Sequence, residues 1–332
     1  MRRQEVESLF QDLEYPEGFN WEPSCEERRC WRGALDLAAP LWRRHARPEH
    51  RQGLEALRLL QGDIPTLGEL DQKLRTIHWR LLPIQGFIPF RAFLQFAAAR
   101  ILPTSIGVRS EASLAHAVEP DYFHEVMGHA AQLFDPEYRA LQELYGQIAS
   151  QAEIREEDQL LDAAQRRVFD LEKGLIQDRD ETQLRIELEY SRHQVASLKS
   201  RFFARGVPVS EAQELSRFGW YTFEYGLISD GRGVAQGRLQ LFGALLLSSP
   251  AQAKRVLSGE VAVNRLTEGV VEEPIDLIGS PDRVFVADSL PEVREILLNV
   301  AGRQDRQRRA RVSRLRRLRR KRAGRTLAHL SA

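Results

Sequence analysis

Two histidines lie five residues apart in the stretch Asp121-Tyr122-Phe123-His124-Glu125-Val126-Met127-Gly128-His129, which reads as a helix. In an α-helix, a step of five residues turns the chain by roughly 140°. Both imidazoles can still converge on one point if the helix borders a cavity. Two neutral imidazoles aimed at one point are typical of a metal site.

The spacing separates this pattern from the helix of a zinc protease, His-Glu-x-x-His, because Gly128 occupies the fourth position after His124. A third ligand must then come from elsewhere in the chain. Two histidines and one carboxylate leave one face of an octahedron open, which suits Fe(II) and oxygen chemistry. A bare pair of histidines is equally consistent with a helix face that binds no metal.

Four segments of the chain, in this order, resemble blocks of the pterin-dependent aromatic amino acid hydroxylases. They are residues 79–89 (WRLLPIQGFIP), 119–129 (EPDYFHEVMGH), 220–227 (WYTFEYGL) and 243–249 (GALLLSS). The resemblance implies a mainly α fold with small β elements and a catalytic domain over roughly residues 15–300. It also implies that His124, His129 and Glu224 hold Fe(II).

The same resemblance implies a site for a tetrahydropterin cofactor. Phe93 would stack on the pterin ring, while Gly86, Phe87 and Ile88 would offer backbone contacts and Glu125 would hydrogen-bond the cofactor. A flat, polar heterocycle is well held by one aromatic face and by amides at its edge. From its position alone, Phe93 is more consistent with a core aromatic.

The substrate pocket is implied in the same way. Arg109 would clamp the amino acid carboxylate through two parallel hydrogen bonds, and Trp220 would line the ring pocket. Ser248, assigned to the same pocket, would support the ligand shell. His116 and Gly219 depart from the family pattern, where larger aromatic residues are usual, so we expect a pocket that is opened at Gly219 and a substrate that is not fixed by the resemblance.

The implied reaction is hydroxylation of an aromatic amino acid by O2, with the reduced pterin supplying two electrons. Phenylalanine, giving tyrosine, is the default substrate, and tryptophan or another ring position is the first alternative. Two other hypotheses remain open from the sequence. One is a zinc hydrolase built on the same three ligands, and the other is a binding protein that acts through the helical hairpin and the basic tail described below.

Composition sets broad limits on the protein. The chain has 332 residues, of which 42% are hydrophobic, enough for one or two domains with a sizeable core. The two cysteines, Cys25 and Cys30, form no disulfide framework and fit a reducing cytoplasm. We expect no signal peptide, no transmembrane segment and no separate regulatory domain before the catalytic domain, here taken as residues 1–302.

A helical hairpin is expected at about residues 150–205. Glu224 lies 95 positions after His129, far more than the family resemblance calls for, so this hairpin is interpreted as an insertion. Two seams with steps of mostly 3 and 4 residues favour a pair of antiparallel helices. The seams are Leu161, Ala164, Val168, Leu171 and Leu175, then Leu184, Leu188, Val195, Leu198 and Phe202. Homo-oligomer formation, partner docking and simple decoration are the possible roles.

The end of the chain is strongly basic. Residues 303–332 contain 12 Arg, one Lys and one acid, so subtraction from the totals of 48 bases and 47 acids leaves 35 and 46 in residues 1–302. An acidic body of net charge −11 therefore carries a basic tail. We expect a helix over 291–300 followed by a tail that is disordered, or helical on binding an acidic surface, RNA or membrane lipid.

Overall fold

The protein is described from a computed structural model, which covers residues 21–84, 90–115, 120–177, 182–229, 238–275 and 281–330. Helices dominate these residues, as the sequence predicts, and one large hydrophobic core joins most of them. The α-helices are α2 (Cys25–His45), α3 (Pro48–Ala56), α4 (Leu67–Arg75), α5 (Phe90–Phe96), α6 (Pro136–Ala149), α7 (Glu156–Gln177), α8 (Thr182–Phe202), α9 (Glu211–Gly219), α10 (Ala244–Ser248), α11 (Pro250–Leu257) and α12 (Leu290–Leu330).

Short helical turns connect these helices. Two are π-helical turns, η4 (His124–Ala130) and η6 (Trp220–Glu224). The others are 3-10 turns, namely η1 (Leu59–Gln61), η2 (Ala97–Ala99), η3 (Glu111–Ser113), η5 (Gln132–Phe134) and η7 (Glu268–Glu272). Within the described residues, no helix combines the length and the apolar content needed to cross a bilayer.

Two small sheets complete the fold. Strands β1 (Arg80–Ile84) and β2 (Ile101–Ser105) pair in parallel, with Arg80 opposite Ile101. The second sheet has the strand order β4-β3-β6-β5 and contains β3 (Leu227–Ser229), β4 (Leu239–Leu241), β5 (Ala262–Arg265) and β6 (Arg283–Ala287). Strand β6 lies between β3 and β5 and is almost entirely buried.

The N-terminal helices begin at strong caps. Ser24 caps α2 in a reciprocal capping box with Glu27, and Thr66 caps α4 in the same way with Glu69. Helix α2 buries Trp31 against Phe123, with ring centroids 5.1 Å apart in an edge-to-face arrangement. This contact packs α2 against the segment that precedes His124.

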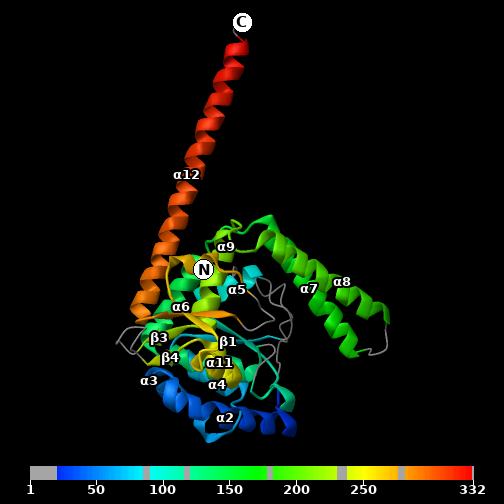
Figure 1. The fold of residues 1–332 in the computed structure, drawn as a ribbon, viewed down its shortest axis with the longest axis vertical. Coiled ribbons are helices and arrows are strands. Elements are labelled where there is room, and N and C mark those ends of the chain that lie inside the picture. Colours follow the sequence, from blue (N-terminus) through cyan, green and yellow to red (C-terminus); the bar gives the residue numbers. More distant parts are fainter. Residues whose placement is uncertain are drawn as a thin grey trace.

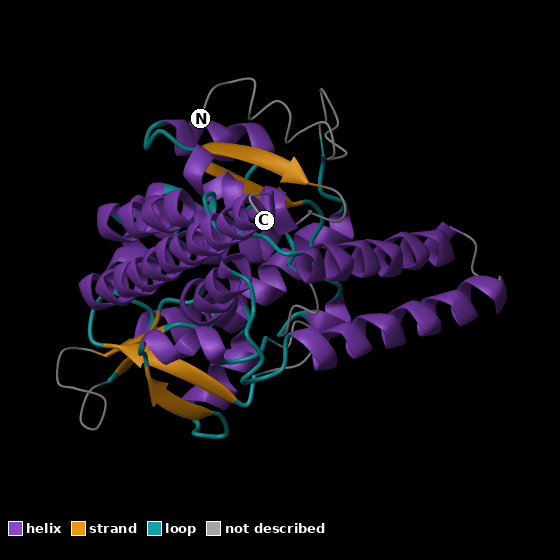
Figure 2. Ribbon diagram, turned by 90° about the horizontal axis from the view of Figure 1, so that it is seen from above, coloured by secondary structure: helices purple, strands orange, loops and turns teal. Residues whose placement is uncertain are grey.

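The predicted hairpin is confirmed as helices α7 and α8, which project together from the body (Figures 1 and 2). Leu161 and Val195 are buried between the two helices, in a small hydrophobic cluster separate from the main core. An ion pair between Arg192 and Glu172 at 3.0 Å bridges the two helices at their surface. The hairpin thus satisfies its apolar seam internally, as a self-contained arm.

The C-terminal helix corrects a prediction. Helix α12 does not end near residue 300 but continues to Leu330 as one 41-residue helix that extends far from the body (Figure 1). The reason is that no proline follows Pro291, and Arg, Leu and Ala are strong helix formers. Contacts to the body hold its first half, because buried Gln304 donates to Glu214 at 2.8 Å and Arg311 pairs with Glu153 at 2.7 Å.

Candidate metal centre

The two histidines lie on a π-helical turn, η4. In such a turn each hydrogen bond spans five residues instead of four, and the Ala131 N–H donates to the Val126 carbonyl at 3.2 Å. Residues five apart therefore lie above one another, as residues four apart do in an α-helix. The α-helical rotation of about 140° assumed from the sequence is wrong here, because the wider turn brings His124 and His129 to the same side.

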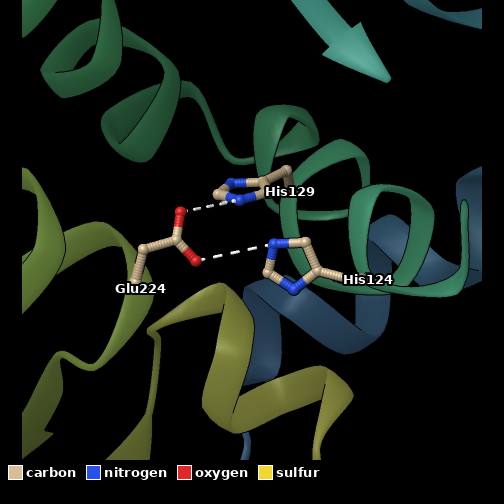
Figure 3. Close-up of side chains that lie close together, drawn as sticks. All are labelled: His124, His129 and Glu224. Atoms are coloured by element: carbon tan, nitrogen blue, oxygen red, sulfur yellow. Dashed lines mark ion pairs between the residues drawn. The ribbon is translucent and has the colours of Figure 1, made fainter. Parts of the chain in front are cut away.

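Glu224 lies at the end of the second π-helical turn, η6, where the Tyr225 N–H likewise donates to the Trp220 carbonyl at 3.0 Å, five residues back. The Glu224 carboxylate meets both imidazoles (Figure 3). Its oxygens lie 3.0 Å from His129 Nε2 and 3.5 Å from His124 Nε2. One donor atom from each of these residues lies within 4.8 Å of the others, so the three groups define a metal-sized site.

Helix α10 packs against both π-helical turns, and two glycines allow this contact. A Cβ on Gly128 would lie 2.7 Å from the Ala244 carbonyl oxygen, and one on Gly243 would lie 2.3 Å from the Glu224 carbonyl oxygen. Real side chains do not approach backbone that closely. The glycines therefore let α10 fix the position of the His124 segment relative to Glu224.

Ser248, at the end of α10, contacts His124. Its Oγ lies 2.9 Å from His124 Nδ1, and its hydroxyl donates to the Leu245 carbonyl at 3.4 Å. With the hydroxyl proton used in that way, the Nδ1–H of His124 donates to Oγ, and Nε2 keeps a free lone pair facing Glu224. Serine thus selects the tautomer in which Nε2 is available to a metal.

Burial and the Glu224 charge set the protonation of the metal-free site. Burial lowers the pKa of His124 to about 4, although Glu224 opposes this change. Burial also disfavours the charged form of His129, but the carboxylate outweighs it and raises the pKa to about 9. For Glu224, burial acts to raise the pKa and the two imidazoles lower it below its usual value. Burial raises the pKa of the adjacent Glu125 to about 8.

Arg109 is buried beside the site, but its two-donor edge is already used. Its Nε and one Nη donate to the two oxygens of Asp121 at 3.0 and 2.7 Å, and the other Nη donates to the Ser248 carbonyl at 2.7 Å. The predicted two-bond clamp on a substrate carboxylate is therefore not available in this arrangement. Asp121, which also accepts from the His124 N–H at 2.9 Å, is a site residue that the sequence interpretation missed.

The remaining predicted pocket residues lie in different settings. Trp220 is partly buried, and its Nε1–H has no hydrogen-bond partner among the described residues. The prediction that Gly219 opens the pocket is wrong, because a Cβ there would meet the Tyr145 hydroxyl at 2.8 Å and that tyrosine fills the space. Phe93 lies in α5, and its side chain is outside the described part of the chain. The other predicted residues outside the described ranges are Gly86, Phe87, Ile88 and His116.

Two imidazoles and one carboxylate on a mainly helical body form a candidate site for one metal ion. Over residues 14–186, more than half of its length, the chain matches the family model described as biopterin-dependent aromatic amino acid hydroxylase. The chain therefore belongs to that family. This membership confirms the predicted enzyme class and its dependence on a pterin.

Relatives that are named phenylalanine-4-hydroxylase agree with this assignment. The chain is 29% identical to phenylalanine-4-hydroxylase of Mesorhizobium japonicum over 244 residues, which cover 73% of this chain and 67% of that protein. It is also 29% identical to phenylalanine-4-hydroxylase of Vibrio cholerae over 160 residues, 48% of this chain. In that second alignment the chain spans 54%, about half, of the relative's length.

Solved structures support the fold. The cold-active phenylalanine hydroxylase of Colwellia psychrerythraea superposes with a TM-score of 0.63 at 19% identity, covering 89% of this chain and 94% of that one. Phenylalanine hydroxylase of Chromobacterium violaceum, with bound iron(III) and 7,8-dihydrobiopterin, gives a TM-score of 0.62 at 20% identity and covers 90% of this chain and 91% of that one. The hydroxylase-like, mainly α fold is thereby confirmed.

Proposed function

We propose that this chain is an Fe(II)- and tetrahydropterin-dependent monooxygenase that converts phenylalanine to tyrosine. The single observation that carries the proposal is the convergence of His124, His129 and Glu224 within 4.8 Å, in a member of the pterin-dependent hydroxylase family. The relatives named phenylalanine-4-hydroxylase support phenylalanine as the substrate. Family membership argues against the zinc hydrolase and the non-catalytic binding protein.

The donor set fits ferrous iron. His124 and His129 each present Nε2 toward Glu224, and these three side chains would hold the metal while leaving positions open. Bound iron and reduced pterin together supply the oxygen activation that ring hydroxylation needs. His124 is buried and only small parts of His129 and Glu224 are exposed, which limits the access of bulk water to the reacting atoms.

The pterin would lie beside η4. We assign its ring face to Phe93 and its polar edge to the backbone of Gly86, Phe87 and Ile88, as the family resemblance implies. Glu125 is a buried carboxyl next to the first metal ligand, and its raised pKa of about 8 leaves it mostly protonated at neutral pH. In that form it is able to donate a hydrogen bond to the cofactor as well as accept one.

For the substrate, Trp220 and Arg109 remain the proposed binding residues. Since Asp121 occupies the two-donor edge of the guanidinium, Arg109 would act on a substrate carboxylate mainly through its positive charge and its remaining N–H. The Trp220 Nε1–H, which lacks a partner among the described residues, is a further available donor. Because His116 departs from the family pattern, hydroxylation of tryptophan or of another ring position is the second candidate.

The deciding experiment supplies the purified chain with Fe(II), a reduced pterin and O2, and compares phenylalanine, tryptophan and tyrosine as substrates. We expect tyrosine to form from phenylalanine, with pterin oxidised in proportion. His129→Ala should abolish turnover, whereas His193→Ala, on the exposed side of α8, should not. Turnover of tryptophan alone would replace phenylalanine in the proposal, and zinc-dependent peptidase activity without pterin oxidation would reject it.

We further propose roles for the parts outside the catalytic centre. The chain divides into a catalytic domain over residues 1–302, with the α7–α8 hairpin as an insertion, and a basic C-terminal segment over 303–332. The hairpin would serve a second copy or another protein as a docking arm, since Ile186 and Tyr190 are exposed one turn apart on α8. The basic end of α12 would bind an anionic partner. A cytoplasmic location fits two unpaired cysteines.

A further inference from the structure

A buried histidine contacts the segment between the two metal-site histidines. His50, in α3, is 2% exposed, and its Nε2 lies 2.8 Å from the carbonyl oxygen of Met127. Met127 is the third residue after His124 and the second before His129. His50 therefore contacts the backbone that determines how the two imidazoles are spaced.

Helix α3 also approaches the backbone at the C-terminal end of η4 through a glycine. Gly53 lies one turn after His50, and a Cβ on it would come 1.8 Å from the Ala131 carbonyl oxygen. Only glycine lets the two backbones approach so closely. His50 and Gly53 thus form one face of α3 that is shaped to receive the C-terminal end of the π-helical turn.

A π-helical turn needs such support. Its five-residue hydrogen bonds are poorer than the regular ladder, and carbonyls near the end of any helix require partners from outside. Two side chains reach successive carbonyls here, His50 Nε2 at Met127 and Gln132 Nε2 at Gly128, the latter at 2.9 Å. Both donors stabilise the wide turn in preference to a regular α-helix.

The protonation and partners of the His50 ring point to its bond with Met127. Burial, with Arg47 and Arg51 nearby, lowers the pKa of His50 to about 4, so the ring is neutral at pH 7. The Met127 carbonyl only accepts, so the single ring proton is on Nε2, and Nδ1 is buried without a partner among the described residues. An apolar ring packed on Trp42 would fill the same space without burying an unpaired nitrogen.

We infer that His50 is a positioning residue of the metal centre, because its Nε2–H bond to Met127 holds η4 in the wide turn that aims His124 and His129 at one ion. The inference rests on the proposed metal site but not on the proposed substrate. Without this donor, the segment relaxes toward an α-helix, in which the two imidazoles diverge by roughly 140°. Metal affinity and metal geometry should both change.

The test uses cobalt(II) as the metal probe on the full chain, without pterin or amino acid, and follows its visible spectrum. His50→Phe keeps an aromatic ring but removes the donor, and His50→Gln keeps an N–H donor. Leu54→Ala loosens the same helix, α3, at a buried residue whose side chain donates no hydrogen bond. Thermal unfolding shows that each variant is folded, and His50→Leu replaces the Phe variant if that one is not.

We expect His50→Phe to raise the dissociation constant for cobalt(II) about tenfold and to alter its spectrum. His50→Gln should bind within about threefold of the original chain, and Leu54→Ala should lose thermal stability while its cobalt spectrum stays the same. A folded His50→Phe chain with unchanged affinity and spectrum would overturn the inference, as would an equal loss in Leu54→Ala. Normal cobalt binding without phenylalanine turnover would reject the proposed substrate alone.

Discussion

His124 and Ser248 meet through a 2.9 Å hydrogen bond between Nδ1 and Oγ, although 124 residues separate them in the chain. The bond fixes the imidazole so that Nε2 faces Glu224. Because groups that orient a metal-bound histidine typically contribute 10–100-fold to metal affinity, Ser248→Ala should weaken iron or cobalt binding by about tenfold or more. Ser258→Ala, at the exposed end of α11, is the control and should leave affinity unchanged. Metal titration followed by absorption decides, and equal affinity in both variants would exclude this role.

The ion pair between Arg109 and Asp121 is expected to be essential for stability. Asp121→Asn keeps the shape of the side chain but leaves the buried guanidinium without a charge partner, which costs about 3–5 kcal/mol in comparable pairs. Removing the exposed Arg32–Asp63 pair by Asp63→Asn should change stability by less than about 1 kcal/mol. Urea unfolding of both variants measures the difference. Comparable losses would show that the buried pair contributes no more than a surface pair.

The three converging side chains could be predicted because the sequence carries them in short, ordered blocks. The turn that aims them could not, because π-helical geometry depends on contacts from a distant helix. His50 and Gly53 in α3 contact Met127 and Ala131, which lie about 80 residues away in the chain. No local sequence pattern predicts these contacts. A rotation calculated for a regular α-helix therefore placed the imidazoles too far apart.

The sequence also does not show which hydrogen-bond donors of a side chain are already used within the fold. Arg109 matches its expected position, yet its partner Asp121 lies 12 residues on, and its third contact is the backbone of Ser248. The family resemblance implies a carboxylate clamp, whereas in the fold the same edge of the guanidinium binds Asp121. The long α12 was missed for a different reason, since charge density was taken as a sign of disorder although arginine itself favours helix.

Stability should depend on pH through His50. Its folded-state pKa of about 4 lies below the ordinary value of 6.5, so the unfolded chain binds more protons between these values. The free energy of unfolding should therefore fall as pH decreases from 6.5 to 4, by about 3 kcal/mol from this residue. His50→Gln removes that contribution, and the remaining groups cancel in the comparison. Parallel stability curves for the two chains over this range would contradict the assignment.

Binding through the basic end of α12 should depend strongly on salt. Residues 303–332 carry 13 Lys and Arg, and release of counterions makes affinity for a polyanion fall steeply with ionic strength. We expect retention on immobilised heparin at low salt and elution well below 1 M NaCl. A chain with Arg316, Arg317, Arg319 and Arg320 changed to Gln should elute earlier, while one with Arg166 and Arg185 changed in the hairpin should not. Salt-insensitive retention would exclude an electrostatic partner.

The close packing of η4 on α10 makes Gly128 a sensitive position. An added Cβ would lie 2.7 Å from the Ala244 carbonyl oxygen and 3.0 Å from its Cα, both backbone atoms that have no rotamer to change. Gly128→Ala should therefore force the two segments apart, lower the free energy of unfolding by about 1–3 kcal/mol and weaken metal binding as well. Gly68→Ala, in α4, has no heavy atom within 4 Å of its Cβ and should stabilise the helix by up to about 1 kcal/mol. If Gly128→Ala unfolds like the original chain and binds cobalt(II) equally well, α10 does not fix the ligand geometry, and the position of Glu224 relative to the histidines must depend on other contacts.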